Sequence, residues 1–244
     1  LHCINKANNG IEKSKLNGEV VVADNGSTDS SIEISTDAGA KVVYIENKGY
    51  GSALNGGIES ALGDYIIMGD SDSTYNFEDI PKFVEQLDKG YDLVIGNRFL
   101  GGIEKGAMPF LNKFVGNPVL SFIAKKLFNS NIGDFHCGLR AFTKEAYKKM
   151  ELRSSGMEFA TEMIAKATLL NLKITEVPTT LSVSISPRTP HLKPFRDGLR
   201  HLNLMMTYSF IKLFNKSFNV LLSLTIPLYL ITLIFAPFNL GNIE

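Results

Sequence analysis

The fold is decided by residues 19–68, which read EVVVADNGSTDSSIEISTDAGAKVVYIENKGYGSALNGGIESALGDYIIM. Three short runs in this stretch are rich in β-branched residues and predict strands. These predicted strands cover residues 19–23, 41–45 and 64–68. Residues 30–38 and 50–62 lie between them and are long enough to form crossover helices. Strands and helices that alternate in this way predict parallel βαβ units, with helices covering both faces of the sheet.

The same alternation continues after residue 68. Further strands are predicted at residues 91–95 and 173–177, with a crossover helix at 78–89 before the first of them. The fold class is therefore α/β, with a Rossmann-like and mostly parallel sheet. Parallel sheets bind ligands at the carboxyl ends of their strands, so the residues that follow each strand are the candidates for function.

The composition excludes several classes of protein. The chain has 244 residues, of which 44% are hydrophobic, and its 25 Lys+Arg balance its 25 Asp+Glu. That much apolar material supports a sizeable core and excludes a disordered tail or a disulfide-stapled miniprotein. The net charge of zero argues against a nucleic-acid-binding protein. Cys3 and Cys137 match no metal-ligand spacing and suggest no disulfide framework, which fits a reducing compartment.

Two polar turns that contain glycine follow the first two predicted strands. Residues 24–29 read DNGSTD and residues 47–52 read NKGYGS. Asx and Gly residues build turns, and Ser or Thr caps helices, so both turns have a purely structural interpretation. The alternative interpretation is functional, because the free amides of the glycine-rich turn can approach a phosphate or a nucleoside.

A pair of carboxylates follows the third predicted strand. Residues 69–73 read GDSDS, so Asp70 and Asp72 share one face of an extended segment. Hard oxygen ligands of this kind suit Mg²⁺ or Mn²⁺ that holds a diphosphate. Two acids directly after a buried apolar run are unfavourable unless a cation lies between them. The sequence therefore predicts a metal site at this end of the strand.

Six segments occur in order between residues 18 and 202. They are VVADNGSTDSS, NKGYGSALNGGI, IIMGDSDSTYNFED, GNRFLGG, GDFHCGLRAF and EVP. In this order they resemble the family 2 glycosyltransferases, and most of all the membrane-anchored synthases that attach a sugar to dolichyl or undecaprenyl phosphate. The resemblance implies a glycosyltransferase A fold, in which a nucleotide-sugar donor lies over the strand ends. It also implies a divalent ion that bridges the DxD motif to the donor diphosphate.

The resemblance further implies roles for single residues on the donor side. Asp24 would contact the nucleobase or ribose, and Asp70 and Asp72 would hold the metal, with Asp72 counted among the catalytic residues. Residues 186–194 are too rich in proline for a helix or a central strand, and they predict a basic loop able to fold over the diphosphate. The remaining predicted donor contacts are Gly26, Lys48, Gly51, Arg188 and Lys193.

Two arginines are candidates for binding the phosphate of an acceptor. Arg98 follows the fourth predicted strand and should point into the same cleft as the DxD motif, and Arg140 matches the DxxxGxR pattern of the similar enzymes. Forked guanidinium groups suit phosphate oxygens. Asp134 and Glu162 are also counted among the catalytic residues, and Asp134 is predicted to orient Arg140 or the sugar hydroxyls. Glu162 matches an acid common in the family, and it equally suits a helix cap, since the helix dipole favours an acid in the first turn.

The C-terminal part of the chain has the features of a membrane segment. Residues 218–238 carry no charge and are mostly apolar, and about 20 such residues span a hydrocarbon core as a helix. Residues 183–216 before them contain six Lys or Arg and one Asp, and basic flanks stay on the cytoplasmic side. An amphipathic helix in the membrane interface is predicted in this basic part. Its apolar positions are Leu199, Leu202, Met206, Phe210 and Leu213. A buried core helix is the alternative for residues 218–238.

The expected organisation has three parts. They are a catalytic domain at residues 1–185, a basic loop with the amphipathic helix at 186–216, and a transmembrane segment at 217–244. The catalytic domain would lie on the cytoplasmic side of the membrane. We expect the chain to belong to a longer protein, with the first strand of the family before Leu1 and more membrane sequence after Glu244. The chain contains no Trp, which argues against the processive synthases of the same family and their QxxRW motif.

The predicted reaction moves a hexose from a UDP- or GDP-sugar to a polyprenyl phosphate, with inversion of the anomeric carbon. No strong general base is needed, because the second pKa of a phosphate monoester is about 6. The first alternative is a soluble or peripheral family 2 enzyme that acts on a glycan, and the second is a sugar-nucleotide pyrophosphorylase. The third is a non-catalytic protein that binds sugar nucleotides or serves as a membrane scaffold. A homo-oligomer is left open.

Overall fold

The computed structural model describes residues 1–128, 130–185, 198–214 and 217. The chain divides into two compact units, Leu1–Met206 and Thr207–Glu244. The first unit contains all the strands and the predicted catalytic domain. It is described here by itself.

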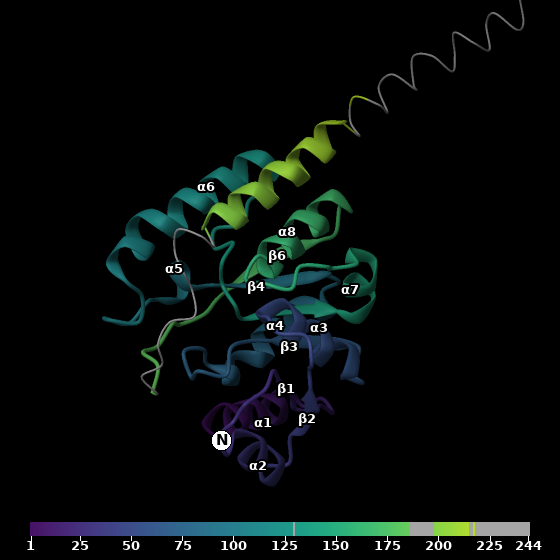
Figure 1. Cartoon of the computed structure of the whole chain (residues 1–244), viewed down its shortest axis with the longest axis vertical. Helices are drawn as coiled ribbons and strands as arrows, with labels where there is room; N and C mark the ends of the chain where they lie inside the picture. Colours follow the sequence, from purple (N-terminus) through teal and green to yellow (C-terminus); the bar gives the residue numbers. More distant parts are fainter. Residues whose placement is uncertain (129, 186–197, 215–216, 218–244) are drawn as a thin grey trace, which may run out of the picture. The chain divides into compact units, whose positions relative to one another are not determined.

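Six strands in the described ranges form two sheets (Figure 1). They are β1 (Val21–Asp24), β2 (Lys41–Tyr44), β3 (Tyr65–Met68), β4 (Leu93–Asn97), β5 (Arg140–Thr143) and β6 (Ile174–Pro178). β1 and β2 pair in parallel as a two-stranded sheet. The other four strands are ordered β3-β5-β4-β6, with β4 parallel to β6 and β5 antiparallel to both of its neighbours. β3, β4 and β6 therefore all run in the same direction.

The expectation of a mostly parallel sheet is wrong, because the larger sheet is mixed. The five predicted strands form within two residues of their expected positions. β5 was not predicted, since its sequence RAFT contains a single β-branched residue and shows no polar and apolar alternation. It becomes a strand because it pairs on both sides, with β3 and β4, and this pairing buries its first three residues. Strand formation here depends on tertiary context more than on local propensity.

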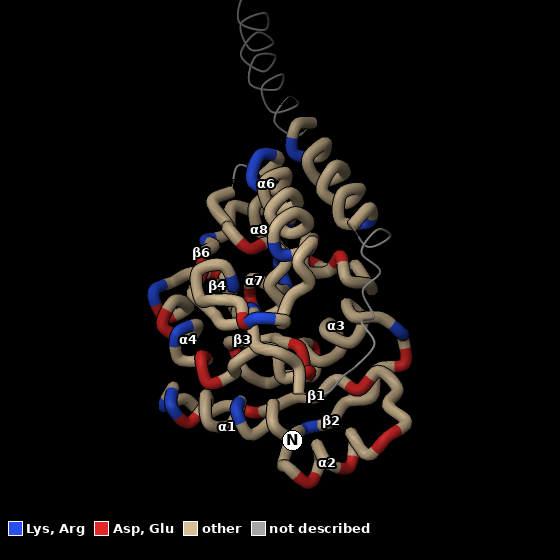
Figure 2. The backbone as a smooth tube through the Cα atoms, turned by 90° about the vertical axis from the view of Figure 1, so that its left-hand side faces the viewer, with Lys and Arg blue, Asp and Glu red and all other residues tan. Residues whose placement is uncertain are grey.

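The helices connect and cover the strands. They are α1 (His2–Ser14), α2 (Ser31–Asp37), α3 (Tyr50–Ser60), α4 (Ile80–Asp88), α5 (Arg98–Gly101), α6 (Asn117–Phe128), α7 (Lys144–Met150) and α8 (Phe159–Leu169), with a 3-10 turn η1 (Phe77–Asp79) and a π-helical turn η2 (Asn112–Gly116). α2, α3 and α4 occupy the three predicted crossovers. Figures 1 and 2 show α1 and α2 beside β1 and β2 at one end of this unit, and α6 and α8 at the other.

The core is centred on β4. All five of its residues are buried, so neighbouring elements cover both of its faces, as expected for this sheet. Phe83 from α4 and Met163 and Ile164 from α8 are among the fully buried side chains. Burying a side chain of this size stabilises a fold by about 1.5–3 kcal/mol. This packing holds the carboxyl ends of β3 and β4 in fixed positions.

Within the described residues, no helix has both the length and the apolar character needed to cross a bilayer. The predicted membrane segment at residues 218–238 lies outside the described ranges, as do Arg188 and Lys193. Residues 198–214 form a helix, which agrees with the helical spacing seen in the sequence. Its predicted apolar positions Leu199 and Met206 are exposed. A place in the membrane interface stays a prediction for this helix.

Candidate active site

The candidate site lies at the carboxyl ends of β3 and β4, which point to the same edge of the sheet. Asp70 and Asp72 follow β3, and Arg98 follows β4 directly. The loop before β5 passes next to Asp70, where Gly138 N donates a hydrogen bond to the Tyr75 hydroxyl at 2.9 Å. A Cβ at position 138 would lie only 2.6 Å from Asp70 Oδ2, so glycine allows this close approach. The predicted metal-binding acids and one predicted phosphate-binding arginine are thus placed at one edge.

The carboxylate of Asp72 is held by its own turn. Its Oδ1 accepts hydrogen bonds from Thr74 N at 3.0 Å and from Thr74 Oγ1 at 2.6 Å. Ser73 between them has a φ of 68°, in the left-handed region. Ser184 Oγ donates to the main-chain oxygen of Asp72 at 2.9 Å, and Ser182 N donates to Thr74 O at 2.8 Å. The segment after β6 therefore lies alongside the DxD turn and fixes it from a second side.

The two acids of the DxD motif repel each other. Burial, and after it the charge of Asp72, raises the pKa of Asp70 from 3.8 to about 6. A hydrogen bond with Tyr50 and the charges of Arg98 and Arg140 act in the opposite direction on this pKa but do not cancel the rise. The carboxylate of Asp70 therefore still predominates at neutral pH, but its site holds the negative charge less favourably than water does, and a nearby cation would stabilise it.

The donor set fits a divalent cation that shares its coordination with a ligand. Asp70 and Asp72 provide hard carboxylate oxygens, which suit Mg²⁺ or Mn²⁺. A cation between them would relieve the repulsion that raises the pKa of Asp70. In the part of the chain that the structure describes, no group of three or more His, Cys, Asp or Glu side chains could hold a metal. Oxygen atoms of a diphosphate or of water could complete the coordination.

We predict that Asp70→Asn stabilises the metal-free protein in a pH-dependent manner. The pKa of Asp70 is about 6 in the folded protein and 3.8 as its ordinary value, so the folded protein binds this proton more tightly than the unfolded chain does. The resulting stabilisation is fully present below pH 3.8 and is lost as the pH rises through 6. At pH 7.5 the Asn variant should exceed the wild type in free energy of unfolding by about 2–3 kcal/mol. The difference should shrink towards pH 4. Urea titrations with EDTA at both pH values measure it, and equal stability at pH 7.5 would contradict the raised pKa.

The glycine-rich turn after β2 packs closely against the main chain of Ser154 and Ser155. Gly51 N and Ser52 N both donate to Ser155 O, at 2.8 and 3.2 Å. A Cβ on Gly51 would lie 2.0 Å from Ser154 O, and one on Gly49 would lie 2.2 Å from Ser155 O. The expectation that these free amides meet a phosphate is therefore wrong for Gly51, because its amide already has a main-chain partner. The glycines are needed so that the segment before α8 can approach the start of α3.

A small side chain at position 51 should be disruptive. We expect Gly51→Ala to lower the free energy of unfolding by about 1–3 kcal/mol, because the new Cβ collides with a main-chain oxygen that cannot rotate away. Gly57→Ala on the same helix is the matched control. Its Cβ would meet only Ala23 Cβ at 3.2 Å, and alanine favours helix over glycine by about 1 kcal/mol. Thermal and urea unfolding should separate the two variants, and equal effects would refute the close approach.

Glu162 secures the segment that packs on this glycine turn. Its carboxylate, 3% exposed, accepts hydrogen bonds from Arg153 N at 3.0 Å and Ser154 N at 2.7 Å, and pairs with Lys166 Nζ at 2.9 Å. Burial alone would raise the pKa of Glu162, but these hydrogen bonds outweigh it and lower the pKa. Of the two interpretations of Glu162, the structural one therefore agrees with the geometry. The residue positions the neighbouring segment, and a catalytic role for it stays a prediction.

Asn25 braces the turns after β1 and β2 against each other. Its side-chain amide donates to Ile45 O at 2.8 Å and to Asn47 O at 2.9 Å, and its Oδ1 accepts from Gly49 N at 2.8 Å. This role of Asn25 was not predicted from the sequence. The only available signal was its place in the polar turn, where an Asx residue equally serves a local turn.

Three predicted donor-binding residues lie together in these turns. Asp24 accepts hydrogen bonds from Gly26 N at 3.0 Å and Ser27 N at 3.1 Å, and the hydrogen bonding to Ser27 is the largest cause that lowers the pKa of Asp24. Lys48 Nζ donates to Asn25 O and lies beside Gly26, where a Cβ would be 1.9 Å from that nitrogen. The buried Asp24 thus organises its own turn. Its contact with a nucleobase or ribose stays a prediction.

Arg98 and Asp134 form a buried, bidentate ion pair. Arg98 Nε and Nη2 each lie 2.7 Å from a carboxylate oxygen of Asp134, and Arg98 N donates to the same group at 3.1 Å. Burial would raise the pKa of Asp134, but the hydrogen bonds and charge of Arg98 lower it. Of the two predicted roles of Asp134, orienting Arg140 is wrong, because the carboxylate pairs with Arg98. Its contact with the sugar hydroxyls and its catalytic role stay predictions. A phosphate contact of Arg98 stays a prediction.

Glu176 on β6 holds this ion pair in place. Its carboxylate accepts hydrogen bonds from Gly133 N at 2.8 Å, Asp134 N at 2.9 Å and Asn97 Nδ2 at 3.1 Å. Asn97 Oδ1 in turn accepts from the first amides of α5, Phe99 N and Leu100 N. This role of Glu176 was not predicted, since in the sequence the residue stands out only as part of the EVP segment. Its partners are up to 79 residues away along the chain, so only the fold brings them together.

Arg140 is a structural residue in this arrangement. Its guanidinium donates to the main-chain oxygens of Cys137, Phe135 and Ala160, and the residue is 0% exposed. These bonds tie the loop before β5 to the start of α8. The predicted contact of Arg140 with an acceptor phosphate is contradicted here, since no surface of its side chain reaches solvent. In the DxxxGxR segment, Arg140 instead stabilises the loop in which Gly138 lies next to Asp70.

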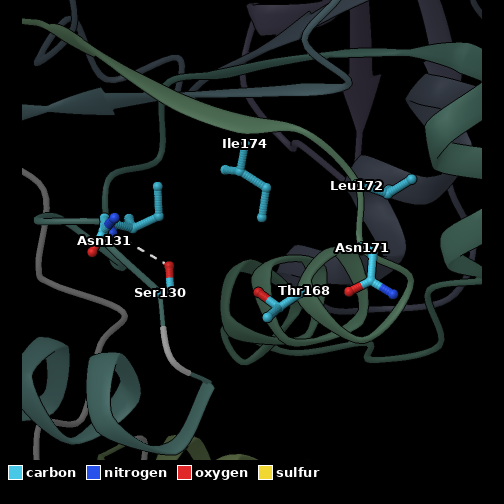
Figure 3. A pocket seen from close by; sticks show the side chains of 7 residues that line it. Ser130, Asn131, Thr168, Asn171, Leu172 and Ile174 are labelled. Carbon is cyan, nitrogen blue, oxygen red and sulfur yellow. Dashed lines mark hydrogen bonds between the residues drawn. The ribbon is translucent and has the colours of Figure 1, made fainter.

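A hollow lies at the opposite edge of the sheet from the candidate active site (Figure 3). It has a volume of 340 Å³, and its lining includes Thr168, Asn171 and Ile174. Ile174 is the first residue of β6, whereas the DxD motif follows the last residue of β3, which runs in the same direction. This hollow is therefore separate from the candidate active site and contains none of its residues.

Comparison with known sequences identifies the family. Residues 1–151 match the family model described as "Glycosyl transferase family 2". The chain belongs to this family. The match covers the turns after β1 and β2, the DxD motif, Arg98 and Arg140.

Relatives of this family 2 chain include two named transferases of Haloferax volcanii. The low-salt glycan biosynthesis hexosyltransferase Agl6 is 41% identical over 207 residues, which are 84% of this chain and 49% of that protein. The dolichyl-phosphate hexose transferase is 33% identical over 161 residues, which are 66% of this chain and 68% of that protein. The chain thus spans about half the length of Agl6.

Solved structures of similar fold include the glucosyl-3-phosphoglycerate synthase from Mycobacterium tuberculosis. Its complex with Mn²⁺, UDP and glucosyl-3-phosphoglycerate matches with a TM-score of 0.64, covering 85% of this chain and 75% of that chain, at 20% identity. This likeness shows the fold. The family 2 chain has an α/β fold of the glycosyltransferase A kind, as predicted, with a mixed sheet in place of the mostly parallel one.

Proposed function

We propose that this chain is the catalytic part of an inverting glycosyltransferase that moves a hexose from a UDP- or GDP-sugar to a polyprenyl phosphate. The observation that carries the proposal is the pair Asp70 and Asp72 at the end of β3. Burial and, after it, the charge of Asp72 raise the pKa of Asp70, and both effects favour a cation, as a metal-bound diphosphate donor would supply. The lipid acceptor is supported by the resemblance of the motifs and by the name of one relative, the dolichyl-phosphate hexose transferase.

The residues at the strand ends have separate tasks in this proposal. Mg²⁺ or Mn²⁺ bound there would stabilise the charge that develops on the leaving nucleoside diphosphate. Thr74 keeps Asp72 in a fixed orientation for binding it. Asp134 keeps the guanidinium of Arg98 charged and fixed at the end of β4, where it attracts the acceptor phosphate. The acceptor phosphate attacks the anomeric carbon directly, since it needs no strong base at neutral pH.

The location of the protein is part of the same proposal. Residues 218–238 would span a membrane, and the basic residues before them, Arg188 and Lys193 included, would remain on the cytoplasmic side with the catalytic domain. Arg188 and Lys193 would reach the donor diphosphate from the segment that follows residue 185. Ser184 supports this, because its hydroxyl contacts the main chain of Asp72.

Transfer of label to lipid tests the proposal. The longer protein that contains this chain would be incubated with Mn²⁺, radiolabelled UDP- or GDP-sugars and polyprenyl phosphate, followed by organic extraction. We expect label in the organic phase, which depends on both metal and acceptor. Label found only in aqueous glycan would favour the soluble transferase, and binding of sugar nucleotide without any transfer would favour a non-catalytic protein.

A further inference from the structure

The helix at residues 198–214 contacts the first unit through a histidine side chain. Its first turns, up to Met206, belong to that unit. In these turns His201 is 7% exposed and Met205 is 0% exposed, and their spacing of four residues places them on one side of the helix. Leu199 and Met206, two of its predicted apolar positions, are exposed. The helix therefore buries a titratable side chain at its contact with the domain.

The buried histidine meets two separate segments of the domain. His201 Nδ1 lies 2.8 Å from the hydroxyl of Thr161, which is in the first turn of α8 and is 0% exposed. The ring of His201 also stands edge-on to the ring of His136, with the two centroids 5.1 Å apart. His136 belongs to the loop before β5, and its buried Nε2 has no hydrogen-bond partner among the described residues. One imidazole thus joins the helix to α8 and to this loop.

The loop before β5 connects this contact to the candidate active site. His136 N donates to Asp134 Oδ1 at 3.4 Å, and the same carboxylate oxygen accepts from Arg98. Gly138, two residues after His136, lies next to Asp70. The position of the helix is therefore linked through a few residues to the end of β4 and to the DxD turn.

The surroundings of the two rings favour the neutral imidazole. Burial, and after it the charge of His201, lower the pKa of His136 to about 3. The charges of Arg98 and Arg140 act in the same direction on this pKa, and the charge of Asp134 opposes them. A proton added to the pair would enter a place where two guanidinium groups already face one carboxylate.

The acids of α8 do not offset this positive charge. The carboxylate of Glu158 lies beside Gly156, and that of Glu162 is paired with Lys166 at 2.9 Å. The first turns of the helix itself contain Arg200 and no acid. A protonated imidazole in this contact would therefore gain little from the charged groups of the elements that pack around it.

We propose that His201 is a positioning residue that holds the start of this helix on α8 and on the loop before β5 while its imidazole is neutral, and that acid releases the helix. A histidine exposed by release has an ordinary pKa of about 6.5, whereas the docked state excludes the proton. Docking is then strongest above pH 6.5 and weakens as the pH falls below it. At pH 5.0 one excluded proton weakens docking by about 30-fold. The inference does not depend on sugar transfer.

Two neighbouring methionines allow a direct test of release. Met205→Cys places a thiol in the contact, and Met206→Cys is the matched control, since Met206 is 54% exposed. The complete chain would react with 4,4′-dithiodipyridine, and mass spectrometry would give the rate at each position. The ratio of the two rates removes the effect of pH on the thiol reaction itself. We expect the Met205→Cys to Met206→Cys ratio to rise by about tenfold or more from pH 7.5 to pH 5.0.

Glutamine at position 201 separates the proton from the packing. The amide of His201→Gln can still form a hydrogen bond with Thr161 but cannot take up a proton, so the ratio should be the same at both pH values. His2→Gln is the control, because His2 is exposed on α1, and it should keep the full pH dependence. Hydrogen exchange of α4 should be equally protected in every variant, which excludes general unfolding as the cause.

The unsubstituted chain provides a second measurement in case the new thiol disturbs the contact. Nuclear magnetic resonance of the imidazole carbons should show His201 staying neutral to lower pH than His2. A ratio that does not change with pH, or that changes equally in His201→Gln, overturns the proposal. If Met205→Cys reacts as fast as Met206→Cys at pH 7.5, the resonance decides, and titration of His201 together with His2 overturns the proposal.

Discussion

Replacing Asp72 with Asn is expected to lower sugar transfer by about 100-fold or more while the fold stays intact. The amide oxygen of Asn can still accept hydrogen bonds from Thr74, so the turn at Ser73 should keep its geometry. The variant loses the negative charge that binds a divalent cation. The leaving diphosphate then lacks the positive charge that stabilises it, and the loss appears mainly in the rate of the chemical step.

Asp37→Asn is the matched control for this experiment, because Asp37 is an exposed acid at the end of α2. Both variants would be assayed for transfer to lipid over a range of Mn²⁺ concentrations, with circular dichroism as a check of the fold. The control should retain wild-type rates and the same metal dependence. Wild-type transfer by Asp72→Asn would mean that Asp72 does not hold the metal, and the assignment of the DxD motif would have to be abandoned.

The parts of the fold that follow local rules were predictable from sequence. β-branched runs located β1 to β4 and β6, because such side chains favour the extended backbone both in the buried β4 and in the partly exposed β2. β5 could not be found in this way. It forms a strand because it pairs with β3 and β4, which lie more than 40 residues earlier in the chain. A short window of sequence around Arg140 does not contain that information.

The same distinction applies to the site. Asp70 and Asp72 were predictable, since their spacing and their place after an apolar strand are local features. The partners of Asp134 and Glu162 were not, because each carboxylate had several candidate partners in the sequence. The fold selected Arg98 for the first and a loop with Lys166 for the second. Sequence therefore predicts where charges gather, and the structure is needed to know which charges neutralise each other.

Replacing Asp134 with Ala is expected to destabilise the protein by about 3–5 kcal/mol. Asp134 is 0% exposed and Arg98 is 7% exposed, so the substitution leaves a guanidinium in the interior without its carboxylate. The amide of Arg98 loses its acceptor as well. Arg98→Met should destabilise the protein to a similar extent, because it leaves the buried carboxylate of Asp134 without its positively charged partner. Urea unfolding at pH 7.5 measures both.

The double variant Arg98→Met with Asp134→Leu separates the ion pair from its surroundings. It removes both charges and fills the space with apolar atoms, and buried pairs replaced in this way lose little stability. We therefore expect the double variant to be more stable than either single variant. Additive losses would show that the two residues act independently, contrary to their bidentate contact. Transfer should stay low in the double variant even though its fold is restored, because a stable end of β4 without the charge of Arg98 no longer attracts an acceptor phosphate.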